Sequence, residues 1–459
     1  MRVLLFSNIR GPEPYLPLNL LSIASLLRSI GHDPVVIDGQ VHRDWLERCL
    51  DVAPDCDLVG LSSYTGPSIN ALLVLQRELR QRGIHRPTVW GGYHGTLAHT
   101  KILEEGWADF VVRGYGEDAV RGVVEYLENG GDLAAIPNIS YVDPSDGQVR
   151  SGPRRKVDFL DALPQLDYSF VDVPSYFTAD RRVVQYVSSY GCPYACTFCA
   201  EPAHSGRRWR GFPVPRVVSD LFDIQGTYRP DRVSFVDPNM SSQPGRIVDL
   251  CRELIRRGSP VLINCNMRSR DVLSIAKELP LSLMREAGFR RVFIGVESGD
   301  DEQLASLRKS ARASDHYTAI QALDAAGIEV QMSFIHDLPG ETADQAAATI
   351  ELAEALLDVT TTGTNQSHHF YMPFPGTELF ESLESDDRLF ASLDQQAWAR
   401  TSTFRANAIW RGNSDRREWV VDQLARLHHQ NPRVLPLKEL ARLRESRELA
   451  SDYVERFLL

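Results

Sequence analysis

Three cysteines lie in one short run of the chain, which reads Gly191-Cys192-Pro193-Tyr194-Ala195-Cys196-Thr197-Phe198-Cys199. The gaps between them are three and then two residues, and an aromatic residue directly precedes the last cysteine. Three thiolates at this spacing can hold three corners of a cubane iron–sulfur cluster and leave the fourth iron open to a ligand that is not protein. An open iron implies chemistry at that iron.

Three other interpretations of these thiols remain open. A structural zinc site needs four protein ligands, and His204 is the only near candidate for the fourth because Cys251 and Cys265 lie far along the chain. The thiols could also be inert core residues. A redox pair in the C-x-x-C of Cys196 and Cys199 would leave Cys192 without a role.

Composition points to an ordinary globular protein of two or three domains, because 43% of the 459 residues are hydrophobic and 24% are charged. The net charge of −11 disfavours a nucleic-acid partner, since phosphate binding needs clustered Lys and Arg. The basic runs at 154–156 and 207–210 are too short to change that expectation.

An odd number of cysteines, seven, with three in one loop, indicates a reduced, cytoplasmic protein and no disulfide scaffold. No apolar stretch approaches the roughly 20 residues of a membrane span, so we expect no membrane association. The first residues read as a buried strand and not as a signal peptide.

Elements that would position these residues alternate along the chain. Within residues 1–130, short apolar runs predict strands at Val3–Ser7, Pro34–Asp38, Leu58–Ser63, Thr88–Gly91 and Phe110–Arg113. Amphipathic helices are predicted between them at Leu18–Ile30, Ser68–Arg82, Thr96–Glu105 and Glu117–Glu128. This alternation is typical of an α/β domain with a doubly wound parallel sheet, which binds ligands at the carboxyl ends of its strands.

Residues 131–182 contain a hairpin-like stretch and few helix signals, which predicts a linker. From 183 to 384 the alternation resumes, with strands predicted at Val183–Ser189, Arg232–Val236, Val261–Asn266, Arg291–Val296, Glu329–Ile335 and Thr364–Tyr371. Helices are predicted at Val214–Gln225, Gln243–Arg257, Asp271–Ala287, Asp301–Ser310 and Ala313–Ala326. Six such strands predict a partial (β/α)6 barrel with its working residues at the carboxyl ends. Residues 385–459 are expected to form a helical C-terminal region.

The cysteine run resembles the cluster loop of the radical S-adenosylmethionine (SAM) superfamily, and five strand-end segments resemble that superfamily in the same order. These segments begin at Val236, Asn264, Ile294, Phe334 and Asn365. The resemblance implies a [4Fe-4S] cluster on Cys192, Cys196 and Cys199 that cleaves SAM to methionine and a 5'-deoxyadenosyl radical.

The same resemblance implies roles in SAM binding for four residues. Glu297 would accept the ribose hydroxyls with Ser298 beside it, and Phe198 would pack near adenine. Arg268 would grip the SAM carboxylate, since a guanidinium pairs with it bidentately. The alternatives are a carboxylate facing a helix N-terminus for Glu297, a surface ion pair for Arg268 and hydrophobic packing for Phe198.

The strand ends of residues 1–130 resemble the cobalamin-binding domain that precedes the barrel in one branch of the superfamily. If cobalamin binds, the resemblance implies contacts from Ser62, Gly91, Gly92 and His94. Asn19 stands where many relatives have a glycine that lets a flat macrocycle approach the backbone. We therefore expect a structural relic of the domain somewhat more than a working cobalamin site.

The sixth predicted strand is unusually polar, and roughly half of its side chains should face the barrel interior. Asn264, Asn365, Gln366 and His368 are the expected contacts to a hydroxyl- and amine-rich substrate. Buried polar groups need such partners because an unsatisfied one costs about 1–3 kcal/mol, although a water-satisfied network remains an alternative.

The reaction expected first is radical dehydration of an amino sugar in aminoglycoside biosynthesis, because the chain resembles the radical SAM diol-dehydratases of that chemistry. Asp237, His336 or His369 would then act as the acid or base. An electron donor of the flavodoxin or ferredoxin type and a partner reductase would assist. The alternatives are a cobalamin-dependent C-methyltransferase in natural-product biosynthesis and, in another class, a non-catalytic iron–sulfur protein.

Overall fold

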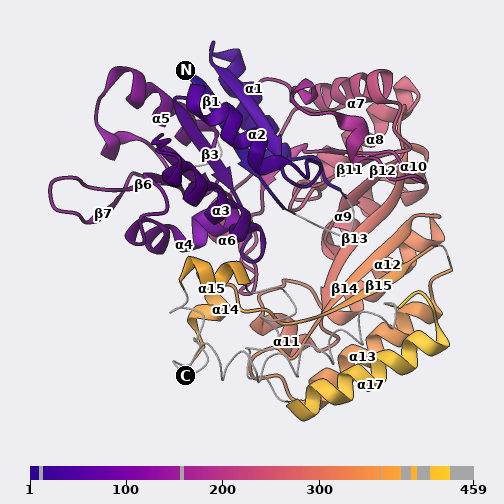
Figure 1. The fold of residues 1–459 in the computed structure, drawn as a ribbon. Coiled ribbons are helices and arrows are strands. Elements are labelled where there is room, and N and C mark those ends of the chain that lie inside the picture. The colour runs from indigo at the N-terminus through magenta and orange to yellow at the C-terminus, as the bar shows by residue number, and fades with distance from the viewer. Residues whose placement is uncertain (10–13, 156–159, 362, 384–393, 401–413, 435–459) are drawn as a thin grey trace.

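The computed structural model describes residues 1–9, 14–155, 160–361, 363–383, 394–400 and 414–434. Two α/β units lie side by side, the first drawn in indigo and purple and the second in magenta to orange (Figure 1). What the sequence predicts for Leu437–Leu459 falls outside the described residues.

The first unit is built on a seven-stranded sheet of order β2-β1-β3-β4-β5-β6-β7. Its strands are β1 (Arg2–Ser7), β2 (Asp33–Asp38), β3 (Leu58–Ser62), β4 (Thr88–Gly91), β5 (Phe110–Val112), β6 (Ile139–Val142) and β7 (Val149–Ser151). The first five are parallel. The doubly wound parallel sheet is therefore confirmed.

Helices cover both faces of this sheet, which is why its central strands are apolar throughout. On one face lie α1 (Leu18–Ser29) and α5 (Glu117–Asn129), whose leucines and valines share a core cluster with β1 and β5. On the other lie α2 (Trp45–Val52), α3 (Ser68–Gln81) and α4 (Gly92–Glu104). The sequence did not predict α2, and α4 begins four residues before its predicted start.

The hairpin that the sequence places in the linker belongs to the first sheet. Strand β6 pairs antiparallel with β5, and β7 pairs with β6. An edge strand of the first domain offers unpaired backbone groups, and the hairpin covers that edge. The stretch after it, with three short 3₁₀ turns, leads on to the barrel.

The second unit is a six-stranded parallel sheet of order β15-β14-β13-β12-β11-β8, open between its edge strands as a partial barrel must be. Its strands are β8 (Val183–Tyr186), β11 (Arg232–Phe235), β12 (Ile263–Asn266), β13 (Phe289–Glu297), β14 (Glu329–His336) and β15 (Asn365–Phe370). Its helices are α7 (Val214–Tyr228), α8 (Pro244–Arg257), α9 (Ser269–Glu278), α10 (Leu281–Glu286), α11 (Asp301–Ser306), α12 (Ala313–Ala325) and α13 (Ala343–Asp358). The predicted partial barrel is confirmed, and the single helix predicted at Asp271–Ala287 is two.

Burial distinguishes the two faces of the barrel strands. Val330, Met332 and Phe334 of β14 share a core cluster with Ile320 and Leu356 of the covering helices. Because side chains alternate along a strand, the residues between them face the barrel interior. This alternation, which we call the parity of the strand, decides whether each polar residue of β14 faces the helices or the barrel interior. The same holds for the residues of β15 that pair with them.

Smaller elements complete the chain. A two-stranded ribbon of β9 (Ser189–Gly191) and β10 (Trp209–Gly211) encloses the cysteine loop and α6 (Glu201–Ser205). After β15 come α14 (Glu378–Glu381), α15 (Gln395–Arg400), which packs on α3, and α17 (Ser414–Gln430), which packs on α13. Among the described helices, none is both long and apolar enough to cross a membrane.

Candidate cluster, SAM and corrin sites

The cysteine loop leaves the barrel just after β9 and is held by the segment that follows α11. The Thr197 backbone N–H donates to Leu307 O at 3.1 Å. The Cys196 thiol donates to Arg308 O at 3.8 Å, and the Arg268 guanidinium donates to Cys196 Sγ at 3.5 Å. The loop is thus anchored from two different strand ends of the barrel.

The three thiols fit a cluster better than a single metal ion. Among the described residues, no three His, Cys, Asp or Glu side chains converge as one ion requires, which argues against the zinc interpretation. In a cubane each thiolate binds a different iron, so the thiols need not meet at a point. Burial raises the pKa of Cys192 to about 11 and that of Cys199 to about 12. Iron binding must therefore displace their protons.

Gly191 sets the geometry at the entrance of the loop. Its φ is +83°, and a Cβ there would lie 1.9 Å from Arg208 O across the β9–β10 ribbon. We expect Gly191→Ala to break the ribbon and to lower the iron and sulfide content of the reconstituted protein severely. Gly206→Ala is the matched control, because Gly206 also has a positive φ, +64°, but open space around its Cβ position. Equal iron contents in the two variants would contradict this account.

Glu297 is the last residue of β13, and it forms an ion pair that the sequence did not predict. Lys309 Nζ lies 2.6 Å from Glu297 Oε1, and the two side chains are only 10% and 8% exposed. Lys309 also lies 6.0 Å from the centre of the Phe198 ring. Glu297, Lys309 and Phe198 therefore lie together beside the cysteine loop, and Glu297 and Phe198 are two of the residues predicted to bind SAM.

Arg268 lies where the sequence expects it, close to the cluster loop. Its guanidinium stacks 3.7 Å from the centre of the Tyr194 ring, so its alternative as a surface ion pair is not what the structure shows. Arg268 Nη2 is buried and has no hydrogen-bond partner among the described residues. A carboxylate of a bound ligand would satisfy it.

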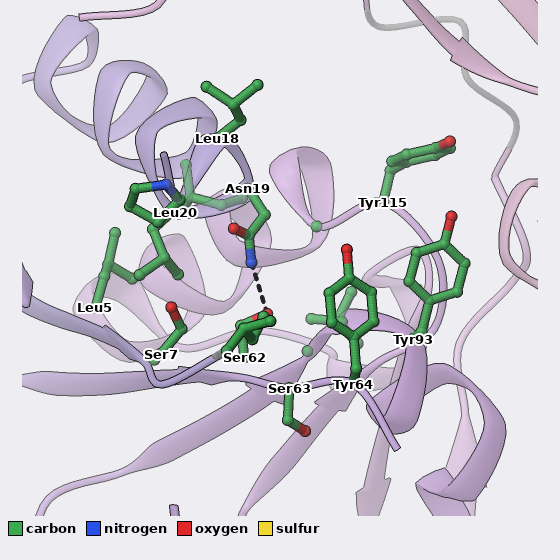
Figure 2. Close-up of a pocket in the computed structure, with 18 of the residues that line it drawn as sticks. Leu5, Ser7, Leu18, Asn19, Leu20, Ser62, Ser63, Tyr64, Tyr93 and Tyr115 are labelled. Carbon is green, nitrogen blue, oxygen red and sulfur yellow. Dashed lines mark hydrogen bonds between the residues drawn. The ribbon is translucent and has the colours of Figure 1, made fainter. Parts of the chain in front are cut away.

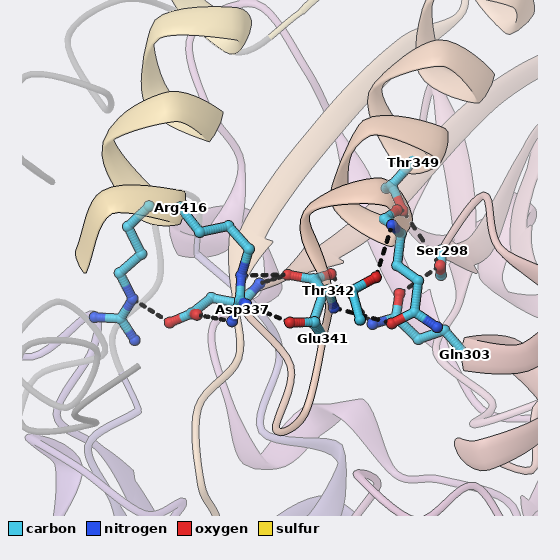
Figure 3. A network of polar contacts seen from close by, with 9 residues as sticks. Ser298, Gln303, Asp337, Glu341, Thr342, Thr349 and Arg416 are labelled. Carbon is cyan, nitrogen blue, oxygen red and sulfur yellow. Dashed lines mark hydrogen bonds and ion pairs between the residues drawn. The ribbon is translucent and has the colours of Figure 1, made fainter. Parts of the chain in front are cut away.

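Ser298 is turned away from this group. Its hydroxyl donates to Gln303 Oε1 at 2.5 Å and lies 3.2 Å from Thr349 Oγ1, inside the network that Figure 3 shows. At the other end of that network, Arg416 of α17 pairs with Asp337 at 2.7 Å and with Glu341 at 3.2 Å. The network joins α11, α13 and α17, so the placement of Ser298 is structural.

Asp237 and His336, predicted as catalytic, are both buried in structural contacts. Asp237 is 0% exposed and accepts hydrogen bonds from the Ser188 N–H, the Ser188 hydroxyl and the Ser189 hydroxyl. His336 points to the helical layer, as the parity of β14 requires, and its Nε2 lies 2.9 Å from His368 Nδ1. His336 therefore faces the helices and Asp237 is held by the two serines, and the catalytic roles of both residues stay predictions.

The polar residues of β15 divide between its faces. Gln366 donates to Ala353 O of α13 at 2.7 Å, and His368 stacks on Phe334, so both face the helices. Asn365 and His369 alternate with them and face the interior. Asn264 also faces the interior, near the amino ends of the strands, where it accepts from Arg232 at 3.3 Å.

His316 lies behind Arg268 and gives a pH prediction. Burial, with Lys309 and Arg268 nearby, lowers its pKa to about 3. Below the ordinary value of 6.5 the unfolded chain takes up a proton that the folded protein refuses, so this histidine lowers stability as pH falls. Between pH 6.5 and 5.5, the free energy of urea unfolding should fall by about 1 kcal/mol more in the wild type than in His316→Gln. Parallel pH profiles would contradict the assignment; the buried carboxylates are present in both proteins and cancel.

A cavity of about 580 Å³ lies at the carboxyl ends of the first sheet, between that sheet and the barrel. Its deep part is apolar, lined by Leu5, Leu20, Ile23 and Val120. Figure 2 shows Tyr64, Tyr93 and Tyr115 gathered at one side and the leucines at the other. The barrel contributes further lining from Val187, Ser189, Tyr190, Val236 and Pro238.

Of the four residues predicted to contact a corrin, three line this cavity and one does not. Ser62, Gly91 and Gly92 line it, whereas His94 does not. His94 is buried with Nδ1 3.0 Å from Thr65 Oγ1 and Nε2 2.7 Å from Gln395 Oε1. Because α4 begins at Gly92, the helix carries His94 away from the strand ends.

Asn19 does not close the cavity. Its side chain reaches from α1 to the end of β3, where it donates to Ser62 Oγ at 2.7 Å (Figure 2). Gly92 has φ +87°, and a Cβ there would lie 2.5 Å from Ser63 O, so only glycine lets the end of β4 pass this close to the end of β3 beside the cavity. Glu117 Oε2 is buried at the wall with no hydrogen-bond partner among the described residues. An amphipathic ligand with apolar faces and polar edges fits this lining.

Comparison with known proteins agrees with this arrangement. Residues 186–353 match the radical SAM superfamily, and residues 9–124 match the B12-binding domain. The chain combines a B12-binding domain with a radical SAM domain. A radical SAM domain uses a [4Fe-4S] cluster and SAM, so these are cofactors of this chain.

Two curated relatives and one solved structure illustrate the likeness. An uncharacterized methyltransferase, PH0819 of Pyrococcus horikoshii, is 27% identical over 80% of this chain and 78% of its own. The anaerobic magnesium-protoporphyrin IX monomethyl ester cyclase of Rubrivivax gelatinosus is 29% identical over 84% and 69%. The cobalamin-dependent SAM radical enzyme OxsB, solved with aqua-cobalamin and SAM, superposes with a TM-score of 0.68 at 23% identity. That superposition covers 79% of this chain and only 52% of the OxsB chain.

Proposed function

We propose that this chain is a cobalamin-dependent radical SAM enzyme that methylates a carbon atom of a polar small molecule. The observation that carries the proposal is the cavity at the strand ends of the B12-binding domain. Its barrel side is lined by Ser189 and Tyr190, which directly precede the cysteine loop, and its other lining includes glycine backbone and the buried carboxylate of Glu117.

Methyl transfer is favoured over the dehydration that the sequence suggested first. The relative PH0819 is described as a methyltransferase, and the cavity of about 580 Å³ remains open although Asn19 lines it. Without dehydration, no partner reductase is required. A non-catalytic iron–sulfur protein would not need the paired Glu297 and Lys309 beside the cluster loop.

In this proposal Cys192, Cys196 and Cys199 hold the cluster, and the buried guanidinium of Arg268 binds the SAM carboxylate. Glu297, fixed by Lys309, accepts the ribose hydroxyls. When bound, the cluster supplies the electron that cleaves SAM, and cobalamin supplies a carrier for the methyl group. Ser62, Gly91 and Gly92 support the corrin, and the barrel wall excludes water from the space between the cofactors.

The substrate would enter the barrel interior, which Asn365, His369 and Asn264 face together with other polar residues such as Ser333 and Ser367. A reduced flavodoxin or ferredoxin is the class of donor for the electron. His369 is exposed at the carboxyl end of β15 and, of the three residues predicted as acid or base, is the one proposed here for proton transfer.

The experiment is anaerobic reconstitution with iron, sulfide and hydroxocobalamin, followed by removal of excess and incubation with SAM and a reductant. Methyl transfer from SAM to a carrier leaves S-adenosylhomocysteine, whereas radical formation leaves methionine and 5'-deoxyadenosine. Stoichiometric cobalt together with both nucleoside products is expected. Absence of bound cobalt with 5'-deoxyadenosine still formed would overturn the proposal and restore dehydration.

A further inference from the structure

Glu201 is a buried carboxylate between the two cofactor sites, and the chemistry proposed above gives it no role. It is the first residue of α6, two positions after Cys199, and it is only 4% exposed. Neither the cluster motif nor the strand ends of the first domain include it. A buried carboxylate needs strong hydrogen-bond donors, and in this structure they come from the other domain.

Two tyrosines of the B12-binding domain occupy the two oxygens of Glu201. The Tyr115 hydroxyl donates to Oε1 at 2.9 Å, and the Tyr93 hydroxyl donates to Oε2. Both tyrosines also line the corrin cavity. Tyr93 stacks on His204 with ring centres 4.4 Å apart and on Tyr64 with ring centres 5.5 Å apart. The carboxylate therefore orients one aromatic wall of the cavity.

The same group of residues holds both ends of the cysteine loop. The Glu201 backbone N–H donates to Cys199 Sγ at 3.4 Å. The Gly191 N–H, one residue before Cys192, donates to the Tyr115 hydroxyl at 2.7 Å. Hydrogen bonds thus link the cavity wall to Gly191, which directly precedes the first cysteine, and to the sulfur of the last cysteine.

The side chains that connect the cavity wall to the cysteine loop are tightly packed. Tyr115 lies edge-on against Tyr190 and His204, with ring centres 4.8 Å and 4.6 Å apart. His204 Nδ1 lies 3.1 Å from Thr96 Oγ1, which in turn accepts from the Gly114 N–H at 2.8 Å. A shift of the cysteine loop must therefore move the tyrosines, and a ligand against the tyrosines must hold the loop.

We infer that Glu201 is a positioning residue that couples the two cofactor sites, so that cluster assembly and corrin binding strengthen each other. The inference rests on the proposed function, because it takes the corrin as the ligand of the cavity. Coupling between sites is reciprocal: the factor by which the cluster changes corrin affinity equals the factor by which the corrin changes cluster affinity.

The test compares hydroxocobalamin binding to cluster-free and cluster-loaded protein, without SAM, followed by its visible spectrum. In the wild type we expect the cluster to raise the affinity by about fivefold or more. In Glu201→Gln and in Tyr93→Phe the ratio of the two affinities should approach one. Asn19→Ala is the matched control, because Asn19 lines the cavity and donates to Ser62, away from the tyrosines and the cysteine loop. Both corrin affinities of this variant should change while their ratio stays as in the wild type.

A second readout guards against variants that bind corrin poorly for other reasons. The electron paramagnetic resonance spectrum of the reduced cluster should change when cobalamin is added to the wild type and should not change in Glu201→Gln. Equal affinities in the two wild-type forms, or an unchanged ratio in Glu201→Gln, would overturn the coupling and leave the proposed function standing. No corrin binding to either wild-type form would overturn both.

Discussion

Alanine in place of Cys192, Cys196 or Cys199 is expected to abolish cluster assembly and with it all cleavage of SAM. Each thiolate holds one iron of the cluster, so the loss of one leaves two irons open and the cluster unstable. The brown absorption of the reconstituted protein, its iron content and the yield of 5'-deoxyadenosine should all fall to background.

Cys251→Ala is the control for this prediction. Cys251 is fully buried in α8, far from the loop, and behaves as a small apolar residue. It should keep its iron content and its 5'-deoxyadenosine yield, with at most a modest loss of stability. A single loop variant that retains a full complement of iron would refute the assignment of that cysteine.

Lys309→Met is expected to have the second largest effect. Removing one member of a buried ion pair leaves an uncompensated charge, which costs about 3 kcal/mol or more. Here that charge is the Glu297 carboxylate, 2.6 Å from the lysine nitrogen. We expect a lower unfolding free energy and a SAM affinity reduced by an order of magnitude or more, measured by equilibrium dialysis.

The double variant Glu297→Gln with Lys309→Met separates stability from SAM binding. It removes both charges, so much of the lost stability should return, whereas SAM affinity should stay low because the ribose loses its carboxylate acceptor. If the double variant is no more stable than Lys309→Met, the two residues are not coupled and the account of the pair is wrong.

Most of the fold was predictable because its signals are local. Buried parallel strands such as Leu58–Ser62 read as short apolar runs, and glycines end the helices between them. The first domain and the barrel follow from that alternation, as does the position of the cysteine loop after the first barrel strand.

The faces of polar strands were not predictable in the same way. In β15 the run Asn365–His369 is polar at every position, so a period of two gives no sign of which residues face inward. His336, Gln366 and His368 were expected in the site, yet they face the helices. Only the packing of Phe334 against the helical layer decides the parity.

Partners distant in sequence escaped prediction for another reason. Lys309 is a single lysine in a basic run, and Glu201 follows the cluster motif without belonging to it. Their roles depend on segments brought together by the fold, such as the contact between Tyr93 and Glu201, which are 108 positions apart. No periodicity or spacing encodes such a contact.

The pairing of His94 with Gln395 joins positions 301 residues apart in the chain. Helix α15 returns to the first domain and buries Trp398 in its core, with its ring centre 6.3 Å from that of His94. The first domain ends with β7 at Ser151, so at a synthesis rate of roughly 5–20 residues per second it waits roughly 12 to 50 seconds on the ribosome before Gln395 is made. The surface of the first domain around His94 is covered only after α15 has been made, which makes this long-range contact a late step of folding.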